Sequence, residues 1–231
     1  MTRTAFLVTC VLLAAAPAAL AAPSTYAAKL DPTNSSGVGG AITFTLDITL
    51  LTANLVATGL VDGVNILHIH GLDSAPGVPV NTIPPPTPVP PNGDTNKDGV
   101  VNTQEAKAAV GLVLLSLAPH TPGTQAEFVG VTSTGGTLAY SVTFDLAQNV
   151  FEPGFTIAGL LPLNFRVFDM HGGIVLLTSN PMDGITGRPG RYDVNLPIAA
   201  GKILATSMPE PASFAALSLG LFGLGIIRRR A

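Results

Sequence analysis

The sequence predicts an all-β protein, a β-sandwich interrupted by one insertion that carries a turn-rich loop and a short helix. Three observations lead to this prediction. Apolar side chains alternate with threonine and other polar residues in several stretches, which is the period of a strand with one buried face. The chain contains 25 glycines and 20 prolines, which divide these stretches into short segments. One stretch, Thr103 to Leu117, has the composition of a helix.

The clearest alternation lies between Gly39 and Leu60. Similar patterns occur at residues 137–146, 164–170 and 173–178. Successive side chains of a strand point to opposite faces, so each pattern buries one face against a second layer. We therefore expect one domain at residues 22–207, with an insertion at residues 84–118 that begins with an extended proline-rich spacer.

The first 21 residues are typical of a cleavable secretion signal. A basic residue near the start precedes an apolar run from Ala5 to Ala16. Ala19 and Ala21 supply the small side chains that signal peptidase requires, so we expect cleavage before Ala22. The alternative is an uncleaved membrane helix, but the run is short for a bilayer and Pro17 interrupts it.

The last 24 residues combine a short motif, an apolar stretch and a basic tail. These parts are Pro209-Glu210-Pro211, the stretch from Phe214 to Ile227, and Arg228, Arg229 and Arg230. As a helix, the apolar stretch would be about 21 Å long, which is short for a hydrocarbon core of about 30 Å. This length predicts a short membrane helix that is anchored only weakly in the bilayer, with the arginines on the cytoplasmic side.

Segment 208–231 closely resembles the PEP-CTERM sorting signal. The resemblance implies that an exosortase recognises the Pro-Glu-Pro motif and cuts nearby. The protein would be anchored transiently in the inner membrane, facing the periplasm, and then passed to the outer surface or extracellular matrix. The alternative is a permanent tail anchor. Mass spectrometry of the envelope form distinguishes them, because a mature chain that keeps Arg228 to Arg230 contradicts processing.

Without its two terminal segments the chain is acidic. Excluding Arg3, the three C-terminal arginines and Glu210 leaves 7 positive and 13 negative side chains, a net charge of −6. This charge disfavours nucleic-acid binding, which needs a basic patch, and makes cations the expected small partners. Cys10 lies within the secretion signal, so the mature chain would contain no disulfide.

Residues 94–105 match the twelve-position EF-hand calcium loop. Oxygen-bearing side chains stand at positions one, three, five and nine, with Gly99 at position six and a glutamate at position twelve. A calcium ion takes six to eight oxygen ligands, and the glycine permits the sharp turn that wraps them around it. The expected ligands are Asp94, Asn96, Asp98, the carbonyl of Val100, Asn102 and Glu105.

The expected calcium site is a single loop without an EF-hand partner. The proline-rich stretch before Gly93 cannot form an entering helix, but the segment after Glu105 can form the exit helix. Calcium would then order the insertion, with a dissociation constant of about 0.1–1 mM. The alternative is a solvated turn that binds no ion.

His68 and His70 are candidate ligands of copper or zinc. In a strand they point to the same face, about 6.5–7 Å apart along the chain, and His171 approaches them if its strand is adjacent. The His-x-His tripeptide resembles the copper site of Cu/Zn superoxide dismutases. The alternative is a structural role, with half-buried imidazoles hydrogen-bonded to the backbone or to Asp169. His120 is expected to be exposed.

Two further segments resemble the CHRD domain, the module named for chordin. They are residues 59–71, which contain Leu67-His68-Ile69-His70-Gly71, and residues 161–173, which end in His171-Gly172-Gly173. The resemblance extends loosely over residues 25–202 and implies a β-sandwich without an established reaction. No Gly-x-Ser-x-Gly turn or phosphate-binding loop is present.

The sequence favours a noncatalytic, calcium-stabilised protein of the envelope or extracellular matrix that binds a polymer, a protein or a surface. The alternative is a redox metalloprotein that uses His68 and His70. A bound transition metal would favour the second function, and calcium alone the first.

Overall fold

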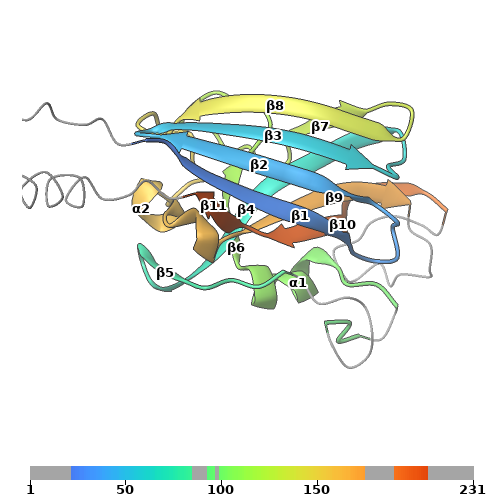
Figure 1. The fold of residues 1–231 in the computed structure, drawn as a ribbon. Coiled ribbons are helices and arrows are strands. Elements are labelled where there is room, and N and C mark those ends of the chain that lie inside the picture. Colours follow the sequence, from blue (N-terminus) through green and yellow to red (C-terminus); the bar gives the residue numbers. More distant parts are fainter. Residues whose placement is uncertain (1–21, 85–92, 97–98, 175–189, 208–231) are drawn as a thin grey trace, which may run out of the picture. The chain divides into compact units, whose positions relative to one another are not determined.

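The structure is a computed structural model that describes residues 22–84, 93–96, 99–174 and 190–207. Figure 1 shows the arrangement of its strands and helices. The strands are β1 (Ser24–Pro32), β2 (Gly39–Asp47), β3 (Leu50–Thr58), β4 (Gly63–Ala75), β5 (Val78–Val80), β6 (Leu112–Ser116), β7 (Gly130–Ser133), β8 (Thr137–Asp145), β9 (Val167–Ile174), β10 (Tyr192–Lys202) and β11 (Leu204–Ser207). The helices are α1 (Thr103–Val110), α2 (Ile157–Leu160) and the 3-10 turn η1 (Leu163–Phe165).

The strands form an antiparallel sheet that is not closed, with the order β5-β4-β9-β10-β1-β2-β3-β8. Strand β11 also pairs with β1, and β6 and β7 pair with β4. Strand β1 joins the two halves of the sheet, because residues 24–30 pair with β2 whereas Asp31 and Pro32 pair with β10. The expected all-β class is therefore confirmed.

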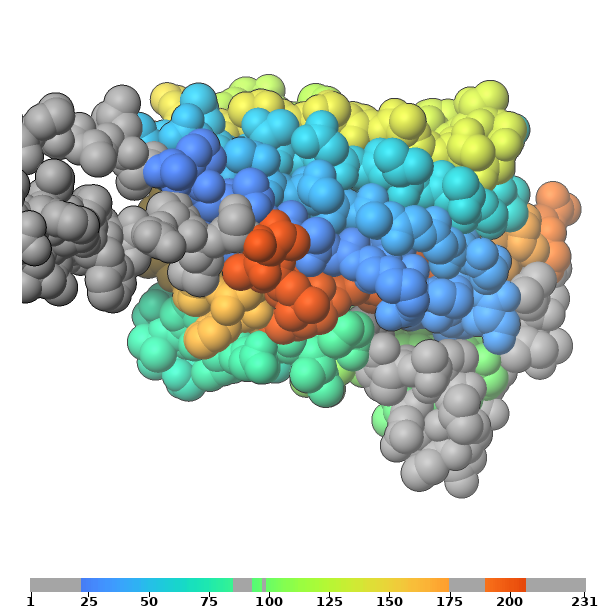
Figure 2. Space-filling model, in the orientation of Figure 1, coloured from blue at the N-terminus to red at the C-terminus, as the bar shows by residue number. Residues whose placement is uncertain are grey.

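The half made of β1, β2, β3 and β8 has one buried and one exposed face, as the alternation predicts. In β2, Ile42 and Phe44 are buried, whereas Thr43 between them is exposed. The exposed face of these four strands lies toward the viewer in Figure 2. The buried side chains join one hydrophobic cluster with residues of β4, β9 and β10, so the two halves share a core.

Strands β4 and β9 are buried on both faces where they pair. Leu67 and Ile69 of β4 and Phe168 and Met170 of β9 contribute to the shared core. The opposite face of this strand pair faces α1, whose Ala106 and Val110 pack with Val167 in a second cluster. The insertion therefore forms a cover over the face of the sheet that carries the histidines.

The helix predicted for Thr103–Leu117 is shorter than expected. It ends at Val110, because Gly111 has a φ of 83° that breaks the helical backbone and brings the chain against Gly71 of β4. A side chain at Gly111 would lie 2.0 Å from the Gly71 carbonyl oxygen. The leucine-rich residues 112–116 instead pair with β4 as β6, so tertiary contacts override their helical composition.

The boundaries of β9 also differ from the prediction. Residues 163–165 form the 3-10 turn η1, and β9 starts at Val167 and continues through the Gly172-Gly173 pair to Ile174. Strands β1 and β10, which connect the two halves of the sheet, were not predicted as elements of their own.

Several predictions concern residues outside the described part of the chain. These are the cleavage-site residues Ala19 and Ala21, the sorting residues Pro209, Glu210, Pro211, Arg228, Arg229 and Arg230, residues 85–91 of the proline-rich spacer, residues 175–178 of a predicted strand, and Asp98 of the expected calcium loop. Across the described ranges, no helix is both long enough and apolar enough to cross a membrane.

Candidate metal centre

Three histidines from two neighbouring strands meet on the face of the sheet below α1. His68 and His70 lie on β4 and His171 on β9, and antiparallel pairing places His68 opposite Asp169 and Ile66 opposite His171. Because residues two apart in a strand share a face, all three imidazoles point to the same side. The expected approach of His171 to the pair is confirmed.

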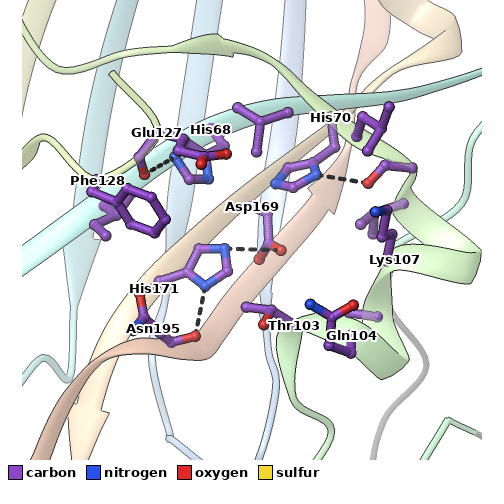
Figure 3. Close-up of a pocket in the computed structure, with 16 residues that line it drawn as sticks. His68, His70, Thr103, Gln104, Lys107, Glu127, Phe128, Asp169, His171 and Asn195 are labelled. Atoms are coloured by element: carbon purple, nitrogen blue, oxygen red, sulfur yellow. Dashed lines mark hydrogen bonds and ion pairs between the residues drawn. The ribbon is translucent and has the colours of Figure 1, made fainter. Parts of the chain in front are cut away.

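The three imidazoles are close enough to share one metal ion. One ring nitrogen from each lies within 4.8 Å of the others, and the ring centroids are 5.4 to 6.3 Å apart. His68, His70 and His171 are only 5%, 7% and 5% exposed, so they are buried rather than half-buried as expected. Figure 3 shows the rings converging on one space beside Asp169.

Backbone carbonyls orient each ring from the outside. Nε2 of His68 bonds to the Glu127 carbonyl at 2.8 Å, Nδ1 of His70 to Gly111 at 3.3 Å, and Nδ1 of His171 to Asn195 at 3.0 Å. A carbonyl oxygen only accepts, so each of these nitrogens carries the proton. The lone pair of each neutral ring therefore lies on the other nitrogen.

The nitrogens that carry these lone pairs have poor protein partners. Nδ1 of His68 and Nε2 of His70 have no hydrogen-bond partner among the described residues. Nε2 of His171 has a 3.4 Å contact with Oδ2 of Asp169, too long for a good hydrogen bond. In their neutral forms the three rings thus place three buried lone pairs in one small volume, which is what a metal ion requires.

The electrostatics keep two of the rings neutral. Burial lowers the pKa of His68 well below the usual histidine value, and the nearby His70 and His171 lower it further. Burial also lowers the pKa of His70, although Asp169 opposes this effect. For His171, burial acts in the same direction, but the charge of Asp169 and its contact outweigh it and raise the pKa. Metal binding at His171 would therefore displace a proton held next to Asp169.

The histidines form the floor of a pocket of about 440 Å³. Thr103, Gln104 and Lys107 of α1 line one side, and Phe128 lines another and is 70% exposed. Helix α1 is held in place at both ends, by its N-terminal cap at Asn102 and by Gly111 against β4. The centre is thus buried at the floor of this pocket, beside α1 (Figure 3).

The prediction for His120 was wrong. It is partly buried, and its ring bonds to the carbonyls of Ala118 and Val150 at 2.8 and 2.9 Å. Both of its nitrogens therefore have partners, in contrast to the three clustered histidines.

Sequence reasoning missed the role of Asp169 beside the cluster. Asp169 is 1% exposed, and its Oδ1 has no hydrogen-bond partner among the residues that the structure describes. The sequence predicts for Asp169 only a hydrogen bond with His68 or His70, in the alternative in which the histidines are structural. The signal that could have identified it is the Asp169-x-His171 spacing, which places both side chains on one face of a strand.

The loop of residues 94–105, the expected calcium site, closes on itself in its described residues. Oε1 of Glu105, the twelfth position, accepts hydrogen bonds from the backbone N–H groups of Thr95 and Asn96 at 2.7 and 3.1 Å. Oδ2 of Asp94, the first position, accepts from the Gly99 N–H at 2.8 Å. The two ends of the loop therefore lie together, as calcium coordination would require.

The end of the loop also starts helix α1. Oδ1 of Asn102 accepts from the N–H groups of Gln104 and Glu105, and Oε2 of Glu105 accepts from the Asn102 N–H. This reciprocal pair is a capping box. Asn34, in the connection between β1 and β2, bonds to both backbone groups of Val101 and ties the loop to the sheet.

Comparison with protein-family models and with curated proteins found no match for this chain. The fold and the histidine cluster therefore define it only as an all-β protein with a candidate metal centre.

Proposed function

We propose that this protein binds one transition-metal ion through His68 Nδ1, His70 Nε2 and His171 Nε2. One observation carries the proposal: three buried imidazoles each direct one ring nitrogen outward to a backbone carbonyl, and one ring nitrogen of each lies within 4.8 Å of the others. Second-shell carbonyls fix the tautomers of metal-binding histidines in this way.

A purely structural role explains this arrangement less well. A buried polar atom without a partner costs about 1–3 kcal/mol, and rotation of a ring toward another acceptor would avoid that cost. Here the two partnerless nitrogens, of His68 and His70, face the same space as His171 Nε2. A shared cation removes the cost at all three positions at once.

Copper and zinc are the metals that this donor set suits. Imidazole binds both ions, and the Irving–Williams order places Cu²⁺ above Zn²⁺ for the same ligands. With copper, the pocket would give small molecules access to a redox ion, in line with the resemblance of His-x-His to the superoxide dismutase site. Metal analysis of the chain purified without a histidine tag should give about one ion per chain, and its absence at saturating copper and zinc would contradict the proposal.

We also propose a calcium site in the loop of residues 94–105. The closure of Glu105 onto Thr95 and Asn96 supports it, because the same carboxylate would close the coordination sphere. Calcium would hold the start of α1, and α1 lines the pocket above the histidines. Both candidate sites therefore adjoin helix α1.

Replacing Glu105 with glutamine should remove measurable calcium binding by the whole chain at millimolar calcium. Glutamine can keep the capping box with Asn102, but it lacks the charge and the two carboxylate oxygens that calcium needs. Isothermal calorimetry should detect binding for the wild type with a dissociation constant of about 0.1–1 mM. Glu127→Gln, at an acidic residue outside the loop, is the control and should bind as the wild type does. Equal heats for Glu105→Gln and the wild type would contradict the site.

The location of the protein remains a proposal based on its terminal segments. A secretion signal at residues 1–21 and a PEP-CTERM-like segment at residues 208–231 support export and transfer to the cell surface or matrix. The shared core between two halves of an open sheet supports a β-sandwich, and the CHRD type is proposed from the resemblance of residues 59–71 and 161–173 alone. We infer a metal-binding protein of the bacterial envelope or matrix.

A further inference from the structure

Asp169 is a buried carboxylate that the protein itself satisfies only in part. Its side chain is 1% exposed, and it lies on β9 directly opposite His68 and two residues before His171. Oδ2 lies 3.4 Å from His171 Nε2, and Oδ1 has no hydrogen-bond partner in the described part of the chain. A buried charge with one unpaired oxygen is costly unless a cation occupies the space beside it.

The other charged groups around the cluster do not fill this role. Lys107 on α1 is the only lysine or arginine that lines the pocket among the described residues, and its side chain is exposed. Glu127 in the segment before β7 and Asp193 on β10 are acidic, so they add to the negative charge around the histidines. Asp169 is therefore the carboxylate placed nearest to the shared space of the three rings.

The spacing of Asp169 and His171 suits two ligands of one ion. Tetrahedral coordination with bonds of about 2.0–2.1 Å places two donor atoms about 3.3–3.4 Å apart. The observed 3.4 Å between Asp169 Oδ2 and His171 Nε2 equals this separation, whereas it is long for a charge-assisted hydrogen bond. A metal ion bound to both atoms would leave this separation unchanged.

We propose that Asp169 supplies the fourth protein ligand, so that the ion is held by three imidazole nitrogens and one carboxylate oxygen. This inference rests on the proposed metal site and specifies its chemistry. A carboxylate is a hard, negatively charged donor that favours divalent ions over Cu⁺, and three nitrogens with one oxygen suit tetrahedral Zn²⁺. The centre would therefore select a divalent ion, with zinc as the resident metal.

Cobalt substitution of the full chain tests the proposal. Co²⁺ reports coordination through its visible absorption, and Asp169→Asn keeps the size of the side chain while removing its charge. Loss of an outer-shell partner lowers metal affinity about 10–100-fold. We expect Asp169→Asn to lower Zn²⁺ affinity by more than about 100-fold and to change the visible spectrum of bound Co²⁺.

Asp169→Cys gives a positive signature at the same position. A thiolate in the coordination sphere should produce a sulfur-to-cobalt charge-transfer band in the near ultraviolet. The wild-type chain should lack this band, because its one cysteine, Cys10, lies in the predicted secretion signal and not at the metal site. Asp193→Asn is the matched control, because Asp193 is a buried aspartate near His171 whose Oδ1 accepts from the Asn195 N–H at 2.8 Å. This control should keep the wild-type cobalt spectrum.

The outcomes separate the two proposals. A wild-type chain that binds neither Zn²⁺ nor Co²⁺ would contradict the metal site as a whole. A wild-type chain that binds both, together with an unchanged cobalt spectrum in Asp169→Asn and no charge-transfer band in Asp169→Cys, would overturn the ligand role of Asp169 alone. If Asp169→Asn does not fold, the band in Asp169→Cys decides the matter.

Discussion

Replacing His171 with alanine should abolish stoichiometric metal binding. The substitution removes one of three nitrogens and leaves two, both on a single strand, β4. Loss of an outer-shell partner already costs about 10–100-fold in affinity, so loss of a ligand should cost more than 100-fold. Competition with a chelator of known affinity measures the change for Zn²⁺ and Cu²⁺.

His120→Ala is the matched control for this experiment. His120 is a partly buried histidine whose two ring nitrogens both contact backbone carbonyls, so its loss removes contacts of the same kind away from the cluster. Its metal affinity should equal that of the wild type. Equal affinities for His171→Ala and His120→Ala would contradict the proposed centre.

A bound metal ion should also stabilise the folded chain against unfolding. An ion that binds only the folded chain adds about 2.7 kcal/mol to the free energy of unfolding at a concentration 100 times its dissociation constant. The wild-type chain should therefore gain thermal stability from zinc or copper, and His171→Ala should not. A shift of the same size in both would indicate binding elsewhere.

Local patterns in the sequence predicted those parts of the fold that depend on them. Strands β2, β3 and β8 alternate in burial because each has one solvated face, and that period is visible in the residues. The same period placed His68 and His70 on one face. The helix was also predicted to start at Thr103, and the structure gives the reason, since Asn102 and Glu105 form a capping box there.

Features that depend on distant segments could not be predicted. Residues 112–116 have a helical composition, but pairing with β4 makes them a strand. Asp169 acquires its position only because β9 lies beside β4, and the carbonyls of Gly111, Glu127 and Asn195 that orient the rings come from three separate segments. The sequence can therefore nominate metal ligands, whereas their tautomers and the carboxylate beside them follow from tertiary structure.

The largest effect on stability should come from Arg166, whose side chain is fully buried. Its guanidinium group pairs with Asp73 at 3.0 Å and donates to the carbonyls of Leu72, Leu160 and Gly159. These contacts fasten the segment between α2 and β9 to β4, the strand that carries two of the histidines. The planar guanidinium group directs its N–H donors to four acceptors, and the ammonium group of lysine cannot reproduce this geometry.

Arg166→Ala should lower the free energy of unfolding by about 3–5 kcal/mol, because it leaves Asp73 without its counter-charge and three carbonyls without donors. Urea titration of the metal-free chain measures this change.

Lys29→Ala is the control, since Lys29 pairs with Asp31 at 2.6 Å but its side chain is 82% exposed. Loss of an exposed ion pair costs less than about 1 kcal/mol because water solvates both charges. Equal changes for the two variants would show that the buried arginine is replaceable, and β4 and β9 would then be held together by their own pairing and by the core alone.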